Sequence, residues 1–264
     1  MRNDSIDKGV EFDWGRTSAD YAKYRDIYPL KMYDEFLRLG FGAKGKLSLD
    51  IGTGTGVIPR FMADYGGELY GIDISANQVK KAIELSSELN INYTVGSAEN
   101  IPFEDGFFDV VCAVQCWRYF DKEKAVSEIK RVLKTNGVLI IAYMQWLADE
   151  SPIIEKSLSL VKKFNPLWDC FSERIEVVNS RFSIDGFRKK EFIEFDCDIP
   201  FTYESWNGRM KASRGIEATL STEETENFSK EHLEMLKSLT KDNFTLKHQI
   251  AIFCFEKINK GERL

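Results

Sequence analysis

The run of residues 47–56, Leu-Ser-Leu-Asp-Ile-Gly-Thr-Gly-Thr-Gly, constrains the fold more than any other part of the sequence. It joins a short apolar strand containing an acid, Asp50, to three alternate glycines, Gly52, Gly54 and Gly56. Glycines at a strand-to-helix turn allow backbone conformations that a Cβ forbids, and they let a ligand approach the main chain closely. The run therefore predicts a loop that holds a nucleotide cofactor.

The spacing of these glycines separates two kinds of cofactor loop. The dinucleotide motif G-x-G-x-x-G requires a third glycine at position 57 or 59, where this chain has Val57 and Pro59. The observed pattern, acid-x-G-x-G-x-G, resembles motif I of the class I S-adenosylmethionine-dependent methyltransferases. The resemblance implies that S-adenosyl-L-methionine is the cofactor and that the loop wraps its methionine part.

A second acid follows at the distance such a site needs. After a predicted helix over residues 57–65, residues 69–73 form an apolar run that ends in Asp73, 23 residues beyond Asp50. A carboxylate at the end of the second strand can accept hydrogen bonds from both hydroxyls of a ribose. The alternative interpretation is a solvated acid at a strand end.

The resemblance continues without a break from about residue 45 to residue 146. A helix is predicted over residues 76–89 and a strand over residues 91–95. The segment 96–103 that follows is similar to the one that lies along the adenine edge in this family. Residues 105–115 then give a turn and a fourth strand, and residues 128–141 a helix, an Asn-Gly stop and a fifth strand.

The predicted fold is α/β, a Rossmann-like doubly wound sheet of seven mostly parallel strands with an antiparallel last strand. We expect a single methyltransferase domain with a helical insertion between strands 5 and 7. Its expected parts are N-terminal lid helices (1–40), a cofactor-binding core (45–146), a cap or substrate insertion that includes strand 6 at 192–201 (147–244), and the last strand (245–257).

The resemblance implies a cofactor site whose members mostly follow the ends of the parallel strands. These residues are Tyr24, Arg25, Asp50, Gly52, Thr53, Gly54, Thr55, Gly56, Asp73, Ile74, Gln78, Ala98, Glu99, Asn100 and Gln115. Ala98 and Glu99 are expected to flank the base.

The N-terminal segment is rich in aromatic and basic residues. Thr17 or Ser18 is predicted to cap a helix that carries Tyr21 and Tyr24 on one face. The string Tyr-x-x-Tyr-Arg-x-x-Tyr-Pro is similar to lid helices of small-molecule methyltransferases, which implies that Tyr24 and Arg25 bind the carboxylate end of the cofactor. Docking of the helix by Tyr21 is an equally open interpretation.

The acceptor side is predicted less specifically. Tyr203, Trp206 and Arg209 share roughly one helical face, which is typical either of a pocket for an anionic or planar substrate or of a packed cap helix. The other candidates for this side are Trp14, Trp117, Tyr143 and Trp146.

Residues 113–121 and 204–209 are similar to the type-11 small-molecule branch, and especially to trans-aconitate-methyltransferase-like proteins. The chain departs from that branch at Arg118, where a histidine is common, so the resemblance assigns no catalytic acid or base. His232, on an acidic and surface-like helix, and His248, in the last strand, are both expected to be structural. The identity of the acceptor atom, O or N, and the use of a general base stay open.

Composition narrows the possible partners. The chain has 264 residues, a formal net charge of -6 and a pI near 5.3, which disfavours a nucleic-acid substrate. It shows no apolar run of 18 residues and no basic-then-apolar leader, so we expect a cytoplasmic protein with no membrane partner, as a monomer or weak dimer. Its five scattered cysteines are predicted to be buried free thiols, and no metal site is expected.

Two alternatives to a methyltransferase remain at this point. A non-catalytic module that binds S-adenosylmethionine for regulation or partner binding is compatible with the lack of an evident base. A nicotinamide oxidoreductase is disfavoured by the glycine spacing and by the absence of a Tyr-x-x-x-Lys pair after the fourth predicted strand.

Overall fold

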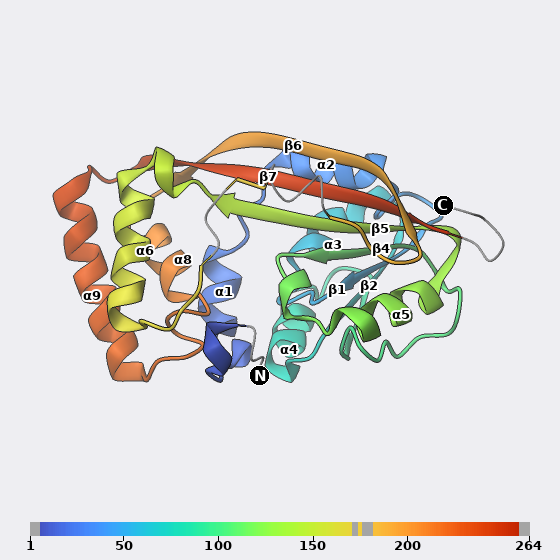
Figure 1. Cartoon of the computed structure of the whole chain (residues 1–264), viewed down its shortest axis with the longest axis horizontal. Helices are drawn as coiled ribbons and strands as arrows, with labels where there is room; N and C mark the ends of the chain where they lie inside the picture. Colours follow the sequence, from blue (N-terminus) through green and yellow to red (C-terminus); the bar gives the residue numbers. More distant parts are fainter. Residues whose placement is uncertain (1–5, 171–173, 176–181, 259–264) are drawn as a thin grey trace. The chain divides into compact units, whose positions relative to one another are not determined.

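The computed structural model describes residues 6–170, 174–175 and 182–258 (Figure 1). The expectation of mixed structure over residues 171–184 falls largely outside the described residues. The helices are α1 (Ser18–Tyr24), α2 (Leu30–Arg38), α3 (Val57–Met62), α4 (Ala76–Leu85), α5 (Lys122–Val132), α6 (Pro152–Phe164), α8 (Tyr203–Lys211) and α9 (Thr222–Leu239). The strands are β1 (Leu47–Ile51), β2 (Glu68–Asp73), β3 (Ile91–Val95), β4 (Phe108–Val114), β5 (Leu133–Trp146), β6 (Phe187–Phe201) and β7 (Phe244–Lys257).

The seven strands form one sheet in the order β3-β2-β1-β4-β5-β7-β6. Strands β1 to β5 are parallel to one another, whereas β7 runs antiparallel to β5 and β6. The first strand, β1, lies inside the sheet, with β2 and β3 on one side of it and β4, β5, β7 and β6 on the other. The strand order therefore reverses between β1 and β4. The predicted doubly wound Rossmann-like fold is confirmed, including its antiparallel last strand.

The chain divides into two compact units. One unit, here called the sheet unit, contains residues 28–144, 175–195 and 250–264. The other, the cap unit, contains residues 1–27, 145–174 and 196–249. Strands β5, β6 and β7 contribute residues to both units, because each continues from one unit into the other.

The sheet unit is organised around buried aliphatic side chains from its parallel strands. Leu49, Ile72, Val111 and Ile141 lie in one core cluster and are fully buried. Strands covered on both faces are expected to read as continuous apolar runs, and residues 110–114 of β4 and 138–144 of β5 do so. This buried platform positions the loops that follow its strands.

The cap unit contains α1, α6, α8 and α9 (Figure 1). Helix α8 contacts both α1 and α9, and α6 contacts α9. Because α8 is surrounded, even polar members such as Asn207 and Arg209 are buried. Helix α9 starts at a capping box that Ser221 and Glu224 form.

Local details differ from the expectation at two element ends. Thr17 occupies the N-cap of α1, but its hydroxyl donates to the carbonyl of Trp14 at 3.0 Å and caps no amide of the helix. The predicted capping role was therefore wrong. Strand β6 begins at Phe187, five residues before the predicted start, because Arg188, Lys189 and Lys190 lie exposed in an edge strand where charged side chains are tolerated.

Candidate functional site

The carboxyl ends of parallel strands meet at the same edge of a sheet. In the sheet unit this edge carries the loops after β1, β2, β3 and β4. Most predicted cofactor residues lie in these loops or at the strand ends that lead into them. The reversal of strand order between β1 and β4 falls within the same edge, which is where open α/β sheets bind ligands.

The glycine loop adopts the conformations that its sequence predicts. Gly52, Gly54 and Gly56 have φ values of +70°, +57° and +78°, in the left-handed region that strongly favours glycine. A Cβ on Gly52 would lie 2.8 Å from the Cβ of Cys116, and one on Gly56 would lie 2.2 Å from the hydroxyl oxygen of Tyr93. Both glycines are therefore required by close neighbours as well as by backbone conformation.

Cys116 and Tyr93 were missed by the sequence prediction, although both shape the loop. The thiol of Cys116 also donates to the carbonyl of Ile51 at 3.0 Å. Burial raises the pKa of Tyr93 to about 12, so its hydroxyl stays protonated at neutral pH. Tyr93 lies on β3 and Cys116 follows β4, so both reach the loop from other parts of the chain.

Asp73 links the loops after β1 and β2. Its Oδ2 atom accepts a hydrogen bond from the backbone N–H of Gly54 at 2.9 Å, and its Oδ1 atom accepts one from the N–H of Ser75 at 2.8 Å. Burial raises the pKa of this carboxyl above its usual value, while the two N–H donors oppose the shift. The predicted ribose acid is thus oriented by the backbone of the glycine loop.

Asp50 lies behind the loop. Its exposed fraction is 2%, its Oδ2 atom accepts from the Thr53 hydroxyl at 2.7 Å, and its Oδ1 atom accepts from the Cys112 thiol at 3.2 Å. Burial, followed by the negative charge of Asp73, raises the pKa of Asp50 to about 7, against the effect of both hydrogen bonds. Its contacts show a carboxyl that supports the turn.

Two large apolar side chains are exposed beside Asp73. Ile74 follows Asp73 directly and is 56% exposed. Val95, the register partner of Asp73 on β3, is 51% exposed. Ala98, in the next loop, is buried. Exposed apolar surface at the end of a buried sheet is consistent with a flat ring binding there.

The remaining predicted cofactor residues have different environments. Gln78 is buried and Asn100 is exposed. Glu99 accepts a hydrogen bond from the backbone N–H of Asp121 at 2.9 Å, so it fastens the loop after β3 to the start of α5. Gln115 has a φ of +62°, and its side-chain amide donates to the carbonyl of Met144 at 2.7 Å.

Tyr24 and Arg25 both have partners within the cap unit. The Tyr24 ring lies against Gly208, where an added Cβ would be 2.3 Å from a ring carbon, and its hydroxyl donates to Glu204 at 2.9 Å. The guanidinium of Arg25 lies 4.4 Å from the centre of the Tyr21 ring. These contacts show a docked α1 helix, and the role of both residues toward a cofactor stays a prediction.

The acceptor candidates divide between the two units. Trp117 is buried in the core cluster of the sheet unit, and Tyr143 packs against that cluster. Burial raises the pKa of the Tyr143 phenol. In the cap unit, Trp14 makes edge contacts with Phe12 and Tyr21.

Trp146, Trp206 and Arg209 come together in the cap unit, as part of the predicted set. The two indoles meet edge to face with centroids 6.1 Å apart, and the Arg209 guanidinium lies 5.4 Å from the Trp146 ring centre. Tyr203 points elsewhere, since its hydroxyl donates to the carbonyl of Thr240 at 2.6 Å.

His232 lies on a helix that the sequence predicts to be acidic and surface-like, yet its side chain is fully buried between helices. Its Nδ1 lies 2.9 Å from the Asn207 Oδ1 and its Nε2 lies 2.9 Å from the Ser157 Oγ, while the Trp206 indole donates to the same Oγ at 3.0 Å. Burial lowers the pKa of His232 to about 4. The acidic sequence around it describes only the outer face of α9.

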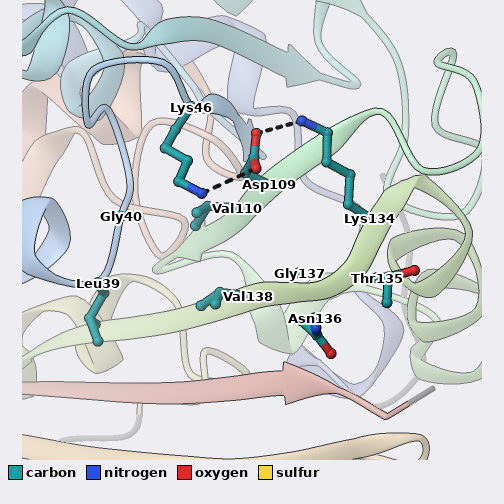
Figure 2. Close-up of a pocket in the computed structure, with 10 residues that line it drawn as sticks. All are labelled: Leu39, Gly40, Lys46, Asp109, Val110, Lys134, Thr135, Asn136, Gly137 and Val138. Carbon is teal, nitrogen blue, oxygen red and sulfur yellow. Dashed lines mark hydrogen bonds and ion pairs between the residues drawn. The ribbon is translucent and has the colours of Figure 1, made fainter.

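A surface pocket of about 230 Å³ lies at the opposite, amino ends of the parallel strands, in the sheet unit (Figure 2). Figure 2 shows Lys46 and Lys134 on either side of Asp109, which binds them at 3.3 and 2.7 Å. No predicted site residue lines this pocket, and both of its lysines pair with the same carboxylate, Asp109.

Some expected features concern the whole chain. All five cysteines are free, Cys112 and Cys254 buried and the other three partly exposed. Among the described residues, no group of three or more His, Cys, Asp and Glu side chains is arranged to hold a metal ion. None of the described helices is both long and apolar enough to span a bilayer.

Residues 49–141 match the model of a methyltransferase domain family. The chain is 31% identical over 229 residues to a methyltransferase of Schizosaccharomyces pombe, covering 84% of this chain and 86% of that protein. It is 36% identical over 129 residues to phosphoethanolamine N-methyltransferase 2 of Caenorhabditis elegans, covering 45% and 30%. The solved structure of the Bacillus subtilis YcgJ protein has a similar fold, with a TM-score of 0.54 and 21% identity over 85% of this chain and 97% of that one.

The chain therefore belongs to the class I S-adenosylmethionine-dependent methyltransferases. The predicted class of enzyme and its cofactor are confirmed at the level of the family.

Proposed function

We propose that this enzyme transfers a methyl group from S-adenosylmethionine to an O or N atom of a small-molecule acceptor, by in-line displacement. The observation that carries the proposal is the Asp73 carboxylate, held by the backbone N–H groups of Gly54 and Ser75 beside the exposed side chains of Ile74 and Val95. This arrangement places a hydrogen-bond acceptor for the ribose hydroxyls beside apolar surface for the adenine ring.

The residues at this edge fit the cofactor chemically. Asp73 would hold the ribose, Ile74 and Val95 would contact the adenine, and the glycine loop would lie against the methionine part, since a glycine backbone lets a ligand approach closely. Two carboxyls, Asp50, which is buried, and Asp73, which is partly buried, suit a cationic ligand better than a diphosphate. When bound, the cofactor supplies an electrophilic methyl group on a sulfonium.

The chain's own contribution is mostly orientation and exclusion of water. Alignment of acceptor and methyl carbon at close range accounts for much of such catalysis, and a dry aromatic surface favours dispersal of the cofactor's charge. The C. elegans relative is named for methylating phosphoethanolamine, which supports a small-molecule acceptor. The acidic net charge supports the absence of a nucleic-acid partner, and the five free thiols support a cytoplasmic location.

The proposal is tested by calorimetric titration of the purified protein with S-adenosylmethionine, S-adenosylhomocysteine and NAD. We expect both adenosyl ligands to bind in the micromolar range and NAD to bind far more weakly. Asp73→Asn is expected to weaken both adenosyl ligands at least tenfold, because it replaces one of the two carboxyl oxygens that accept hydrogen bonds. The matched control is Asp64→Asn, which changes an exposed acid after α3 and is expected to leave both affinities unchanged. Binding of NAD in preference to the adenosyl ligands would contradict the cofactor assignment to this loop.

A further inference from the structure

The cap unit contains a second polar cluster, built from chain segments far apart in sequence. Trp146 ends β5, Arg209 lies on α8 and His248 lies on β7. Arg209 is 3% exposed, His248 is fully buried and Trp146 is partly exposed. The cluster is walled by Phe201 and Trp206, whose rings lie 5.9 and 6.4 Å from the His248 ring, centre to centre.

The protonation of His248 follows from its contacts. Its Nδ1 lies 3.0 Å from the carbonyl oxygen of Leu246, which only accepts hydrogen bonds, so Nδ1 carries the proton. Burial, with a further contribution from the charge of Arg209, lowers the pKa of His248 to about 4. The ring is therefore neutral at pH 7, and its Nε2 presents a free lone pair.

Two buried polar atoms of this cluster have no hydrogen-bond partner among the residues that the structure describes. They are the Nε1 donor of Trp146 and the Nε2 acceptor of His248. A buried polar atom left without a partner is destabilising by about 1–3 kcal/mol, so native proteins retain such atoms mainly where a ligand or water completes them. The two atoms have opposite character, since one donates and the other accepts.

We propose that this cluster binds the methyl acceptor and that the acceptor is a small hydroxy acid. Its carboxylate is held by the Arg209 guanidinium and by the Trp146 N–H, and its hydroxyl donates to Nε2 of His248. The proposal rests on the proposed function for its chemistry, because it names the substrate class of the same enzyme.

The chemistry of the cluster disfavours cationic acceptors and purely apolar acceptors. A cationic acceptor, such as an amine at neutral pH, would be repelled by Arg209. A purely apolar acceptor would leave the Trp146 donor and the His248 acceptor unsatisfied. A hydroxy acid is the simplest small molecule that matches a cation, a donor and an acceptor within aromatic walls.

Binding is measured by ligand-observed NMR on the full chain without cofactor, so that failure of the cofactor assignment does not affect the result. The probes are glycolate, 3-hydroxybutyrate and 4-hydroxybenzoate, each compared with its neutral amide. We expect at least one acid to bind at least tenfold more tightly than its amide. Arg209→Met is expected to remove that preference, because it keeps the length of the side chain and loses the charge.

Two further variants separate the roles of the cluster. Trp146→Phe keeps an aromatic ring beside Arg209 and removes only the N–H, and we expect a loss of about threefold to tenfold in affinity for the acid. Benzoate, which lacks the hydroxyl, is expected to bind more weakly than 4-hydroxybenzoate, and His248→Leu is expected to remove that difference. Lys211→Met is the matched control, since Lys211 lies on the same helix and pairs with Asp20; we expect no more than a twofold change.

The inference is overturned if none of the three acids binds more tightly than its amide, or if Arg209→Met, folded as judged by circular dichroism, keeps the preference. If Arg209→Met does not fold, the test rests on Trp146→Phe. An affinity of Trp146→Phe for the acid equal to that of wild type then overturns the inference. S-adenosylmethionine binding is measured separately on the same samples. A protein that binds the cofactor but no hydroxy acid would therefore retain the proposed function and lose this inference.

Discussion

The two units satisfy their buried polar groups in opposite ways. In the sheet unit, the loop after β1 is organised by backbone groups, as when the N–H groups of Gly52 and Thr53 both donate to the carbonyl of Ile72 at 2.8 and 2.9 Å. In the cap unit, the buried polar groups are side chains that meet across helices, as with His232 and Ser157. The loop in the sheet unit is therefore sensitive to substitutions that change main-chain conformation. The network in the cap unit is sensitive to substitutions that remove a polar side-chain group.

The largest expected effect is at the glycine loop. Gly56→Ala would place a Cβ 2.2 Å from the Tyr93 hydroxyl at a φ of +78°, and we expect a loss of about 3 kcal/mol in the free energy of unfolding, since strain and crowding add. Urea denaturation of wild type and Gly56→Ala measures this difference in the free energy of unfolding.

The control for this change is Gly45→Ala. Gly45 has nearly the same φ, +76°, but a Cβ there would meet no atom within 4 Å. We expect only the conformational loss, about 1 kcal/mol. Equal losses at the two glycines would show that Tyr93 does not crowd the loop.

The corresponding change in the cap unit is Gly208→Ala, where no left-handed conformation is involved. Its Cβ would lie 2.3 Å from the Tyr24 ring, so we expect overpacking to destabilise the α1–α8 contact by roughly 2 kcal/mol. Hydrogen exchange of the α1 amides measures the local opening. Tyr24→Ala, combined with Gly208→Ala, is expected to relieve the clash; if the double variant opens α1 no less than the sum of the two single changes, the contact has been misassigned.

Asp50 makes the stability of the sheet unit depend on pH. Its folded-state pKa, about 7, lies above the ordinary aspartate value of 3.8, so the folded protein binds the proton more tightly than the unfolded chain. Stability is therefore lost as pH rises from about 4 to 7 and is constant above that range.

The measurement is urea unfolding of wild type and Asp50→Asn at pH 5 and pH 8. We expect the variant to gain roughly 2 kcal/mol relative to wild type between the two pH values, because the amide does not ionise. A difference between the two proteins that does not change with pH would show that Asp50 is ionised throughout.

The smallest effect is expected at a helix cap. Thr202 accepts from the N–H of Ser205 at 3.1 Å at the start of α8. Thr202→Ala should destabilise the cap unit by about 1 kcal/mol, whereas Thr202→Ser should be close to neutral. Thermal unfolding of the two variants compares them, and similar losses for both would point to the methyl group instead of the hydroxyl.

The fold of the sheet unit could largely be predicted from the sequence, because the patterns that indicate it are made by residues close together in the chain. Residues 50–56 and the acid Asp73 predicted the loop and the class of enzyme. Each signal depends on main-chain conformation or on hydrophobic periodicity, which neighbouring residues set. Cys116 and Tyr93 escaped prediction because they reach the loop from the segment after β4 and from β3, and no local pattern marks that contact.

The cap unit was less predictable for the same physical reason. The helical spacing of Trp206 and Arg209 was visible, but their neighbours Trp146 and His248 come from other elements, and the burial of His232 depends on helices that enclose it. The sequence alone determined the backbone motif, the parallel sheet and the family. Only the tertiary structure decided which polar side chains lie buried together, because burial and side-chain pairing depend on contacts between segments that are distant along the chain.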